Sequence, residues 1–218
     1  MKTNNGANAK VIHRYTNIAS LFHILQKRAI TLLSPHSWKD RNDSFYIEKY
    51  KDRKKLASVL ALCFSEADET FHHWKVFANG SDGVRITFKN APLIETISSN
   101  KGVITGKIIY KQVKEVSNSR PPIEELPFIK RKPYKDEKEV RIIYTNDKEE
   151  FETKELDIDI GFIEKITINP WINKNLFIAV KSTIRSIDGC EGIKVFRTTL
   201  LENESWKRAA MSEPGDKL

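Results

Sequence analysis

The residues with the clearest capacity for chemistry lie in one short run, Glu-Lys-Glu-Val-Arg, which ends at Arg141. Alternation over residues 137–144 predicts a strand on which Glu137, Glu139 and Arg141 share one face. Two carboxylates this close repel each other, so one of them titrates at a higher pH, which suits acid/base catalysis or stabilisation of a cation. A solvated face neutralised by neighbouring basic residues is the alternative. The face that we expect to pack into the core carries Val140, Ile142 and Tyr144.

A second candidate is Ser65, which ends a near-continuous apolar run that begins at residue 59. Such a run predicts a central strand covered on both faces. A hydroxyl at the end of this strand can hydrogen-bond a ligand. Capping of the helix that we expect at 68–79 is the alternative role.

The third candidate lies in the first predicted strand, residues 11–15, where polar side chains replace the expected apolar ones. His13, Arg14, Tyr15 and Thr16 follow one another, and such a group can hold a phosphate, a ribose hydroxyl or a carboxamide. An edge strand with outward polar side chains is the alternative.

The elements that must position these residues follow from hydrophobic periodicity. Because helical segments stand near the two ends and the strand-rich middle lacks regular strand-helix alternation, we expect an α+β fold rather than a doubly wound parallel sheet. A loop is predicted at 34–44, and a loop or short helix at 121–130. Helices are predicted from a cap at Thr16 or Asn17, at 68–79 and at 170–187. The predicted strands are 11–15, 29–33, 59–65, 83–88, 103–113, 137–144, 162–168 and 192–199.

Composition limits the classes of function. The chain has 218 residues and a formal net charge of +8, which favours a polyanionic partner. The nucleotide-binding patterns GxGxxG and GxxxxGK[ST] are absent from the sequence. We expect one domain over 11–211, with flexible polar termini at 1–10 and 212–218. Neither a signal peptide nor a membrane span is predicted, so the expected location is the cytoplasm.

Metal binding is not predicted. Cys63 and Cys190 lie far apart and match no ligand spacing, which predicts reduced thiols. His72 and His73 are adjacent, so on a helix their side chains point about 100° apart and do not predict a chelate.

Several short motifs resemble a widespread bacterial domain family of unknown function. The opening segment 11–35 combines a polar HRYT strand with an amphipathic helix, and an Asn-Asp loop follows at Asn42. The family continues with a strand ending in Cys-Phe-Ser, here at Ser65, and with a helix tryptophan, here Trp74, before a glycine turn. A YxxExEVRI-like strand ends the resemblance at Ile142. Departures from the family pattern are Ser44 in place of proline and Phe77 in place of tyrosine.

The same pattern resembles the ADP-ribosyltransferase superfamily, including nucleic-acid-modifying toxins of the DarT kind. This resemblance implies mixed, mainly antiparallel sheets that form a split β core with flanking helices. It implies that NAD is the ADP-ribose donor, that Glu139 is the catalytic carboxylate and that Glu137 faces the acceptor. The residues that would contact NAD are His13, Arg14, Tyr15, Thr16 and Ser65, with Trp38 and Asn42 as further candidates.

The implied chemistry is coherent. Cleavage of the nicotinamide glycosidic bond develops an oxocarbenium ion, which a fixed carboxylate beside the ribose stabilises. The basic surface favours a nucleic-acid acceptor, and we expect RNA rather than DNA. A single strand of either kind is suitable, because its bases can enter a pocket. We expect a toxin or phage-defence effector with an antitoxin partner and without a metal. The expected nucleic-acid contacts are Arg85, Lys130, Arg131 and Arg141.

Two other functions stay open. Asp43, with Asp136 and Lys138 in a DxK spacing, could hold Mg²⁺ in a nuclease, although the alternation assigns Asp136 and Lys138 to the core face. A non-catalytic module would instead hold nucleic acid or a protein partner on its basic face, with salt-dependent affinity.

Overall fold

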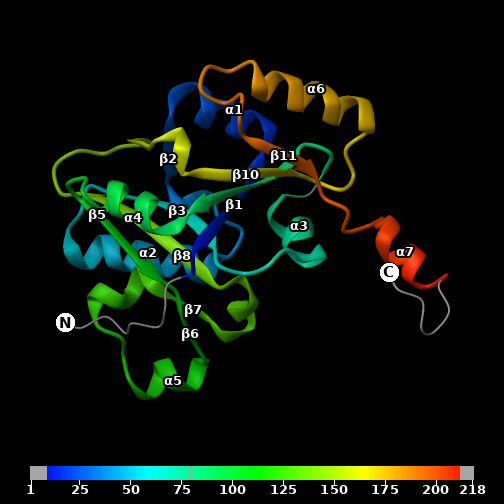
Figure 1. Cartoon of the computed structure of the whole chain (residues 1–218). Helices are drawn as coiled ribbons and strands as arrows, with labels where there is room; N and C mark the ends of the chain where they lie inside the picture. Colours follow the sequence, from blue (N-terminus) through cyan, green and yellow to red (C-terminus); the bar gives the residue numbers. More distant parts are fainter. Residues whose placement is uncertain (1–8, 79, 212–218) are drawn as a thin grey trace.

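One mixed sheet forms the centre of the chain in the computed structural model, which describes residues 9–78 and 80–211 (Figure 1). The strands follow the order β11-β10-β4-β1-β3-β2-β9, while β8 pairs with β3 and β5 pairs with β8. All the pairs in this sheet are antiparallel except β10 with β11, so the predicted α+β class is confirmed. The strands are β1 (Val11–Asn17), β2 (Ala29–Leu33), β3 (Ser58–Ser65), β4 (Gly83–Lys89), β5 (Val103–Lys107), β8 (Glu139–Asn146), β9 (Thr153–Asp157), β10 (Ile163–Ile168) and β11 (Lys194–Arg197).

The sheet is split between β1 and β3. Along its whole length β1 pairs with β4, and β3 pairs with β8, yet within the described residues β1 and β3 share one register pair, His13 with Ser65. Beyond that pair, Arg14 Nη1 donates to the carbonyl oxygen of Cys63 at 2.9 Å. We call β1, β4, β10 and β11 the β1 wing, and β3, β8, β5, β2 and β9 the β3 wing. This arrangement is the split β core that the motifs predicted.

The two faces of the sheet are covered differently. One face carries the main core, with Val140, Ile142 and Tyr144 directed into it as predicted, and α1, α4 and α6 pack there. On the opposite face, α2 covers the β3 wing and α3 covers the β1 wing, so two separate apolar clusters form. The helices are α1 (Ile18–Lys27), α2 (Arg41–Lys54), α3 (Phe71–Phe77), α4 (Asn90–Ser98), α5 (Val113–Asn118), α6 (Lys174–Arg185) and α7 (Glu204–Ala209).

A small lobe extends from the β3 wing. It contains β6 (Ile109–Lys111) and β7 (Ile129–Arg131), which pair in parallel, together with α5 (Figure 1). Two 3₁₀ segments, Ile123–Phe128 and Lys132–Glu137, flank β7. The lobe therefore lies directly before β8, whose first residue is Glu139.

Some boundaries follow the sequence signals and others do not. Asn17 caps α1 as predicted, because its side chain accepts a hydrogen bond from the Ser20 N–H at 2.8 Å. The predicted loop at 34–44 is wrong, because α2 begins at Arg41 behind the Asp40 cap. The helix predicted from Pro170 begins later, at Lys174, behind an Asn173 cap.

The remaining corrections concern shorter elements. The strand predicted at 103–113 is two strands, which end at Lys107 and Lys111. The helix predicted at 68–79 spans Phe71–Phe77, and its predicted last residue, Asn79, lies outside the described residues. The predicted termini lie outside them too, apart from residues 9–10 and the end of the expected domain at 211. Within the described ranges, the helices are too short or too polar to cross a membrane.

Candidate active site

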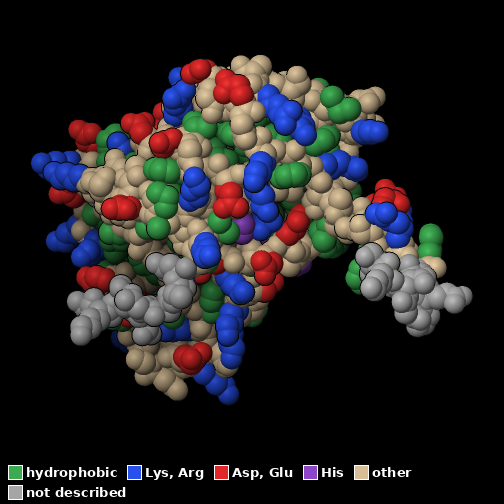
Figure 2. Space-filling model, in the orientation of Figure 1, with side chains coloured by type: hydrophobic (Ala, Val, Ile, Leu, Met, Phe, Trp, Pro, Cys, Tyr) green, Lys and Arg blue, Asp and Glu red, His purple; other side chains and the backbone are tan. Residues whose placement is uncertain are grey.

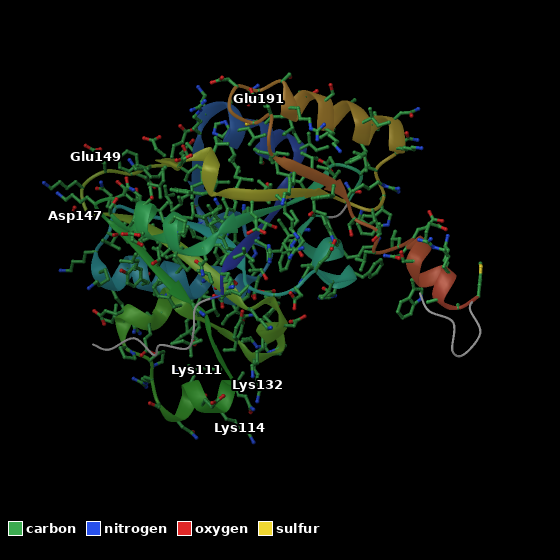
Figure 3. All side chains as sticks on the ribbon, in the orientation of Figure 1. Lys111, Lys114, Lys132, Asp147, Glu149 and Glu191 are labelled. Atoms are coloured by element: carbon green, nitrogen blue, oxygen red, sulfur yellow. The ribbon has the colours of Figure 1, made fainter. Side chains whose placement is uncertain are left out.

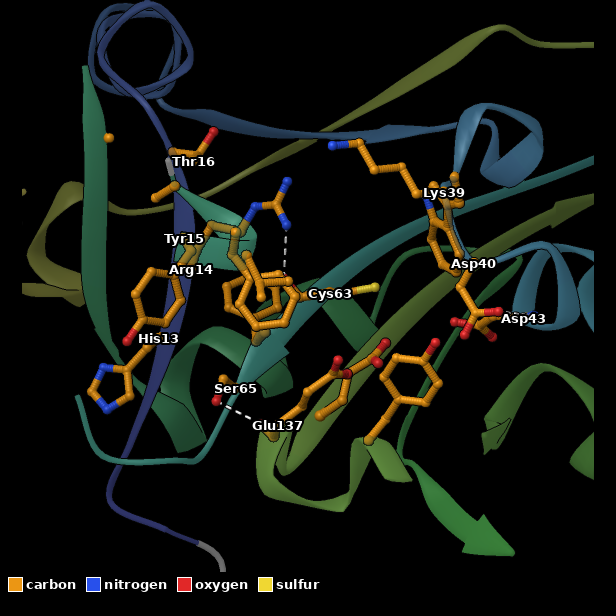
Figure 4. A pocket seen from close by; sticks show the side chains of 18 of the residues that line it. His13, Arg14, Tyr15, Thr16, Lys39, Asp40, Asp43, Cys63, Ser65 and Glu137 are labelled. Carbon is orange, nitrogen blue, oxygen red and sulfur yellow. Dashed lines mark hydrogen bonds between the residues drawn. The ribbon is translucent and has the colours of Figure 1, made fainter. Parts of the chain in front are cut away.

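A cavity of about 750 Å³ opens where the two wings diverge (Figure 4). It lies on the face of the sheet that α2 and α3 cover, between their two apolar clusters. The carboxyl end of β3 forms its floor, and β1 forms one wall. The sequence-predicted residues that line the cavity are His13, Arg14, Tyr15, Thr16, Trp38, Ser65, Lys130, Glu137 and Glu139.

A dense set of charges lies on the β3-wing side of the cavity, with Arg141 buried behind the lining residues. Lys130 Nζ lies 2.6 Å from Glu137 Oε2 and 3.0 Å from Glu139 Oε2, so one ammonium joins the two carboxylates. Arg141 Nε donates to the other oxygen of Glu139 at 2.8 Å. Asp43 completes the set, with Oδ2 3.8 Å from Lys130 Nζ. We call these five residues the carboxylate cluster.

The backbone brings Glu137 and Glu139 together by a turn rather than by strand alternation. Glu137 ends a 3₁₀ segment, and Lys138 adopts a left-handed conformation with φ of 42° before β8 begins. Ser65 fixes this turn, because its Oγ donates to the Glu137 carbonyl at 2.6 Å and accepts from the Ala67 N–H at 3.0 Å. The prediction that Glu137 belongs to the strand is therefore wrong, although its side chain still faces Lys130 beside Glu139.

The two glutamates differ in acidity. Burial raises the pKa of Glu137 to about 7, against the opposing charge of Lys130. Burial would also raise the pKa of Glu139, but Arg141 and Lys130 together bring it below its ordinary value. Burial opposes the charge on Lys130, and its carboxylate partners nevertheless raise its pKa. Near neutral pH the cavity thus holds one fixed carboxylate and one carboxyl group able to exchange a proton.

The β1-wing side of the cavity is less completely paired. His13 Nδ1 lies 3.1 Å from Thr87 Oγ1, and burial, with the charge of Arg85, lowers the pKa of His13 to about 3. The hydroxyl of Tyr15 is buried without a hydrogen-bond partner among the described residues, and burial raises its pKa to about 12. His73 Nε2, on α3, and Arg85 Nε, on β4, are also buried and unpartnered within the described chain.

Three of the predicted contact residues lie elsewhere. Arg141 was expected to contact nucleic acid, but it is fully buried, and its guanidinium holds both oxygens of Asp43 at 2.8 and 2.7 Å. Arg85 is buried under α3, 4.0 Å from a carboxylate oxygen of Glu69. The expected NAD contact of Asn42 is not supported, because Asn42 is exposed on α2 and lines a neighbouring hollow.

The same geometry bears on a metal-dependent reaction. Asp43 is held by Arg141 on both oxygens, and Asp136 and Lys138 are exposed rather than directed into the core. The predicted core face was wrong for the last two because β8 begins only at Glu139. Among the described residues there is no group of three or more His, Cys, Asp or Glu side chains placed to hold a metal ion.

Some residues of the cavity were missed from the sequence. Tyr110 accepts a hydrogen bond on its hydroxyl oxygen from the backbone N–H of Glu139 at 2.8 Å, and it lies in the segment 103–113 that was predicted as one strand. Tyr134 lies under Lys130, with the ammonium 4.9 Å from the ring centroid. Asp40 lines the cavity at the start of α2, and the Asp-Arg-Asn-Asp run was a usable capping signal for that helix.

No protein-family model matches the chain, and a comparison with curated proteins gives no match. Among solved structures, the chain is similar to DarT of Thermus sp. 2.9 in complexes with NAD+, with ADP-ribosylated ssDNA and with carba-NAD+. The TM-score is 0.44 in each case, and the sequence identities are 13%, 12% and 11%. The alignments cover 88%, 87% and 88% of this chain and 96%, 94% and 96% of the DarT chain.

Proposed function

We propose that this protein is an NAD-dependent ADP-ribosyltransferase that modifies nucleic acid. The observation that carries the proposal is the meeting of Glu139, Glu137 and Ser65 with the polar segment of β1 in one cavity. Its volume of about 750 Å³ lies within the range of cofactor pockets. The resemblance of the motifs to ADP-ribosyltransferases supplies the identity of the donor.

Glu139 is the group we assign to the cationic transition state. In the reaction the bond between C1 of the ribose and the nicotinamide nitrogen breaks, and its electron pair neutralises the pyridinium ring. The positive charge that develops at C1 is stabilised by a fixed, desolvated carboxylate. Glu139 is 5% exposed and remains ionised beside Arg141, so it needs no reorganisation to perform this role.

Glu137 is the group we assign to the acceptor. A nucleophilic nitrogen or oxygen of the acceptor forms the new bond to C1 and releases a proton. The pKa of Glu137 is about 7, so near neutral pH its ionised form, the carboxylate, is present to accept that proton. Ser65 acts through Glu137 as a positioning residue, because its hydroxyl is occupied by backbone groups of Glu137 and Ala67.

The acceptor class rests on charge. The net charge of +8 favours a polyanion, and Arg131 is exposed beside the cavity, on the lobe. We keep RNA as the expected acceptor over DNA, and a toxin or defence role with an antitoxin as the biological setting. The neighbouring DarT structure with ADP-ribosylated ssDNA makes DNA the first competitor to test.

The experiment is incubation with labelled NAD and a mixture of RNA, single-stranded DNA and protein, followed by measurement of the label in each fraction. We expect Glu139→Gln to reduce transfer by at least about a hundredfold, as for loss of one electrostatic contact to a transition state. Glu149→Gln, an exposed site on the turn after β8, is the matched control (Figure 3). Full activity of a folded Glu139→Gln protein would exclude the assignment.

A second readout separates the two glutamates. Glu137→Gln should slow transfer to the acceptor more than it slows release of nicotinamide, because bond cleavage depends on Glu139. If the wild-type protein binds nucleic acid but never consumes NAD, the non-catalytic binding module is the better description. Cleavage of nucleic acid that EDTA abolishes would instead favour a nuclease.

A further inference from the structure

Two further hollows adjoin the cavity on the side of the small lobe. Asp40, Asp43 and Lys130 line the cavity and also a hollow of about 380 Å³ between α2, α5 and β7. That hollow in turn shares residues 111–113 and Arg131 with a third one of about 400 Å³. The three hollows therefore follow one another from the carboxylate cluster to the rim of the lobe. We call the two outer hollows the lobe groove.

The rim of the lobe groove is basic. Lys111, Arg131 and Lys132 line it, and Lys114 stands on α5 beside Lys111 and Lys132 (Figure 3). Lys and Arg side chains gather over this lobe in the space-filling view (Figure 2). Within the described part of the chain, Lys111 has one ion pair, at 3.6 Å from Glu125, whereas no ion pair is formed by Lys114, Arg131 or Lys132. The charges of Lys114, Arg131 and Lys132 are therefore not used in ion pairs within the described part of the chain.

The floor of the lobe groove differs from its rim. Tyr46 from α2 and Val113, Val116 and Ile129 from the lobe line the inner hollow. An aromatic ring and aliphatic side chains beneath a row of cations match a strand whose phosphates face outward and whose bases are unstacked. A paired duplex does not present its base faces in this way.

The exposed acidic side chains Asp147, Glu149 and Glu191 stand far from the lobe in Figure 3. Nearer the groove, Asp40 and Asp43 line the inner hollow, Glu125 pairs with Lys111 and Glu115 caps α5. Asp43 is neutralised by Arg141, so the cations of the rim without an ion pair among the described residues, on Lys114, Arg131 and Lys132, are those left to attract a polyanion.

We infer that the lobe groove is the binding track for the acceptor, a single-stranded polynucleotide, which passes from the basic rim to Glu137. Phosphates lie against Lys111, Lys114, Arg131 and Lys132, and bases lie over the floor at Tyr46. The inference rests on the proposed function for the reaction that takes place at Glu137, where the track ends. Binding of the strand along the track does not depend on that reaction. Its test therefore needs no NAD.

The test compares two double charge reversals. Lys114→Glu with Lys132→Glu removes two cations of the rim, and Lys174→Glu with Lys194→Glu changes the same charge on exposed residues of α6 and β11. Binding of a labelled 12-nucleotide DNA, its RNA equivalent and a duplex is measured by anisotropy between about 50 and 200 mM salt. Thermal melting of each protein confirms that it is folded.

We expect the rim variant to bind single strands at least about tenfold more weakly at about 100 mM salt. The magnitude of the slope of log affinity against log salt concentration should fall by about 1.4, since each of the two lost phosphate contacts contributes about 0.7. The control variant should lose only the affinity that any change of the same net charge would remove. The wild-type protein should bind the duplex more weakly than the single strands. Equal loss in both variants, preference for duplex, or no binding by the wild-type protein would overturn the inference. Rim-dependent binding without NAD consumption would leave the track intact and refute the transferase.

Discussion

The two sides of the cavity are built in opposite ways. On the β3 wing every carboxylate of the carboxylate cluster has a cation within 3 Å, and Arg141 alone contacts Asp43, Glu139 and the Pro127 carbonyl. On the β1 wing, buried polar atoms of Tyr15 and Arg85 have no partner among the described residues. Tyr15 and Arg85 are 7% and 6% exposed, close to 8% for Glu137 and 5% for Glu139, so burial of these residues does not explain the difference.

The difference separates two tasks. Under the function proposed above, Glu139 stabilises charge in a transition state, and such a group is most effective when it is held in place beforehand. Under the same proposal Tyr15 contacts the ligand, and such a surface keeps donors and acceptors available. The proposal therefore assigns stability and recognition to different wings, and paired substitutions can test this division.

The largest effect is expected at the two buried arginines. Arg141→Met should lower the free energy of unfolding by about 3–5 kcal/mol, because buried Asp43 would lose the partner of both its oxygens and Glu139 would lose one of its two cations. Arg85→Met should change it by less than about 1 kcal/mol, since its nearest carboxylate is 4.0 Å away and its Nε is unpaired. Urea unfolding monitored by tryptophan fluorescence gives both values. Equal losses at the two positions would refute the division between the wings.

The next effect is a pair of opposite pH dependences. The pKa of Glu137 is raised to about 7, from a usual value of 4.5, so over that range the folded protein keeps a proton that the unfolded chain has lost. The free energy of unfolding therefore falls as the pH rises from about 4.5 to 7. The pKa of His13 is lowered to about 3, from 6.5, so between these pH values the unfolded chain binds a proton that the folded protein does not. The contribution of His13 to the free energy of unfolding therefore falls as the pH drops from 6.5 to about 3.

Between pH 4.5 and 6.5 these two contributions have opposite sign, each at most about 1.4 kcal/mol per pH unit. Glu137→Gln should make the free energy of unfolding rise more steeply with pH than in the wild-type protein, and His13→Gln should make it rise less. Urea titrations at pH 4.5, 5.5 and 6.5 measure the slopes. Parallel curves for the three proteins would show that neither side chain titrates as its surroundings dictate.

The smallest effect is expected at two tyrosine hydroxyls. Tyr110→Phe should lower the free energy of unfolding by about 1–2 kcal/mol, because the Glu139 N–H would lose its acceptor at 2.8 Å. Tyr15→Phe should change it by less than about 0.5 kcal/mol, since its hydroxyl has no partner among the described residues. Thermal unfolding of the two variants, measured in parallel with the wild-type protein, gives both changes in stability. A larger loss at Tyr15 would show that this hydroxyl already supports the fold.

The sequence predicted the strands well where apolar residues follow a regular pattern. Alternation placed Val140, Ile142 and Tyr144 in the core, and the apolar run ending at Ser65 is a central strand, because each strand has one fully covered face. It failed at α2, whose helix is rich in charges and buries only a narrow stripe that includes Ile47. Periodicity is weak there, so the cap at Asp40 was the stronger signal.

The sequence brought several residues of the candidate site to notice, but it did not show how their charges are paired. Composition and spacing could bring Glu137, Glu139 and Lys130 to notice, but the depth of Arg141 depends on Asp43, which is 98 residues away in sequence. An arginine on a polar strand face looks the same in sequence whether it faces water or a buried carboxylate. The left-handed Lys138 was equally hidden, because lysine carries no preference for that conformation.

The split between the wings has a mechanical consequence. The described parts of β1 and β3 are joined by the His13–Ser65 pair and by the Arg14–Cys63 bond, whereas each wing has a full ladder of its own, β1–β4 or β3–β8. The two wings also share the apolar core on the opposite face of the sheet. Glu139 and Tyr15 belong to different wings, so packing in that shared core, more than backbone hydrogen bonds between the wings, sets the width of the cavity between them.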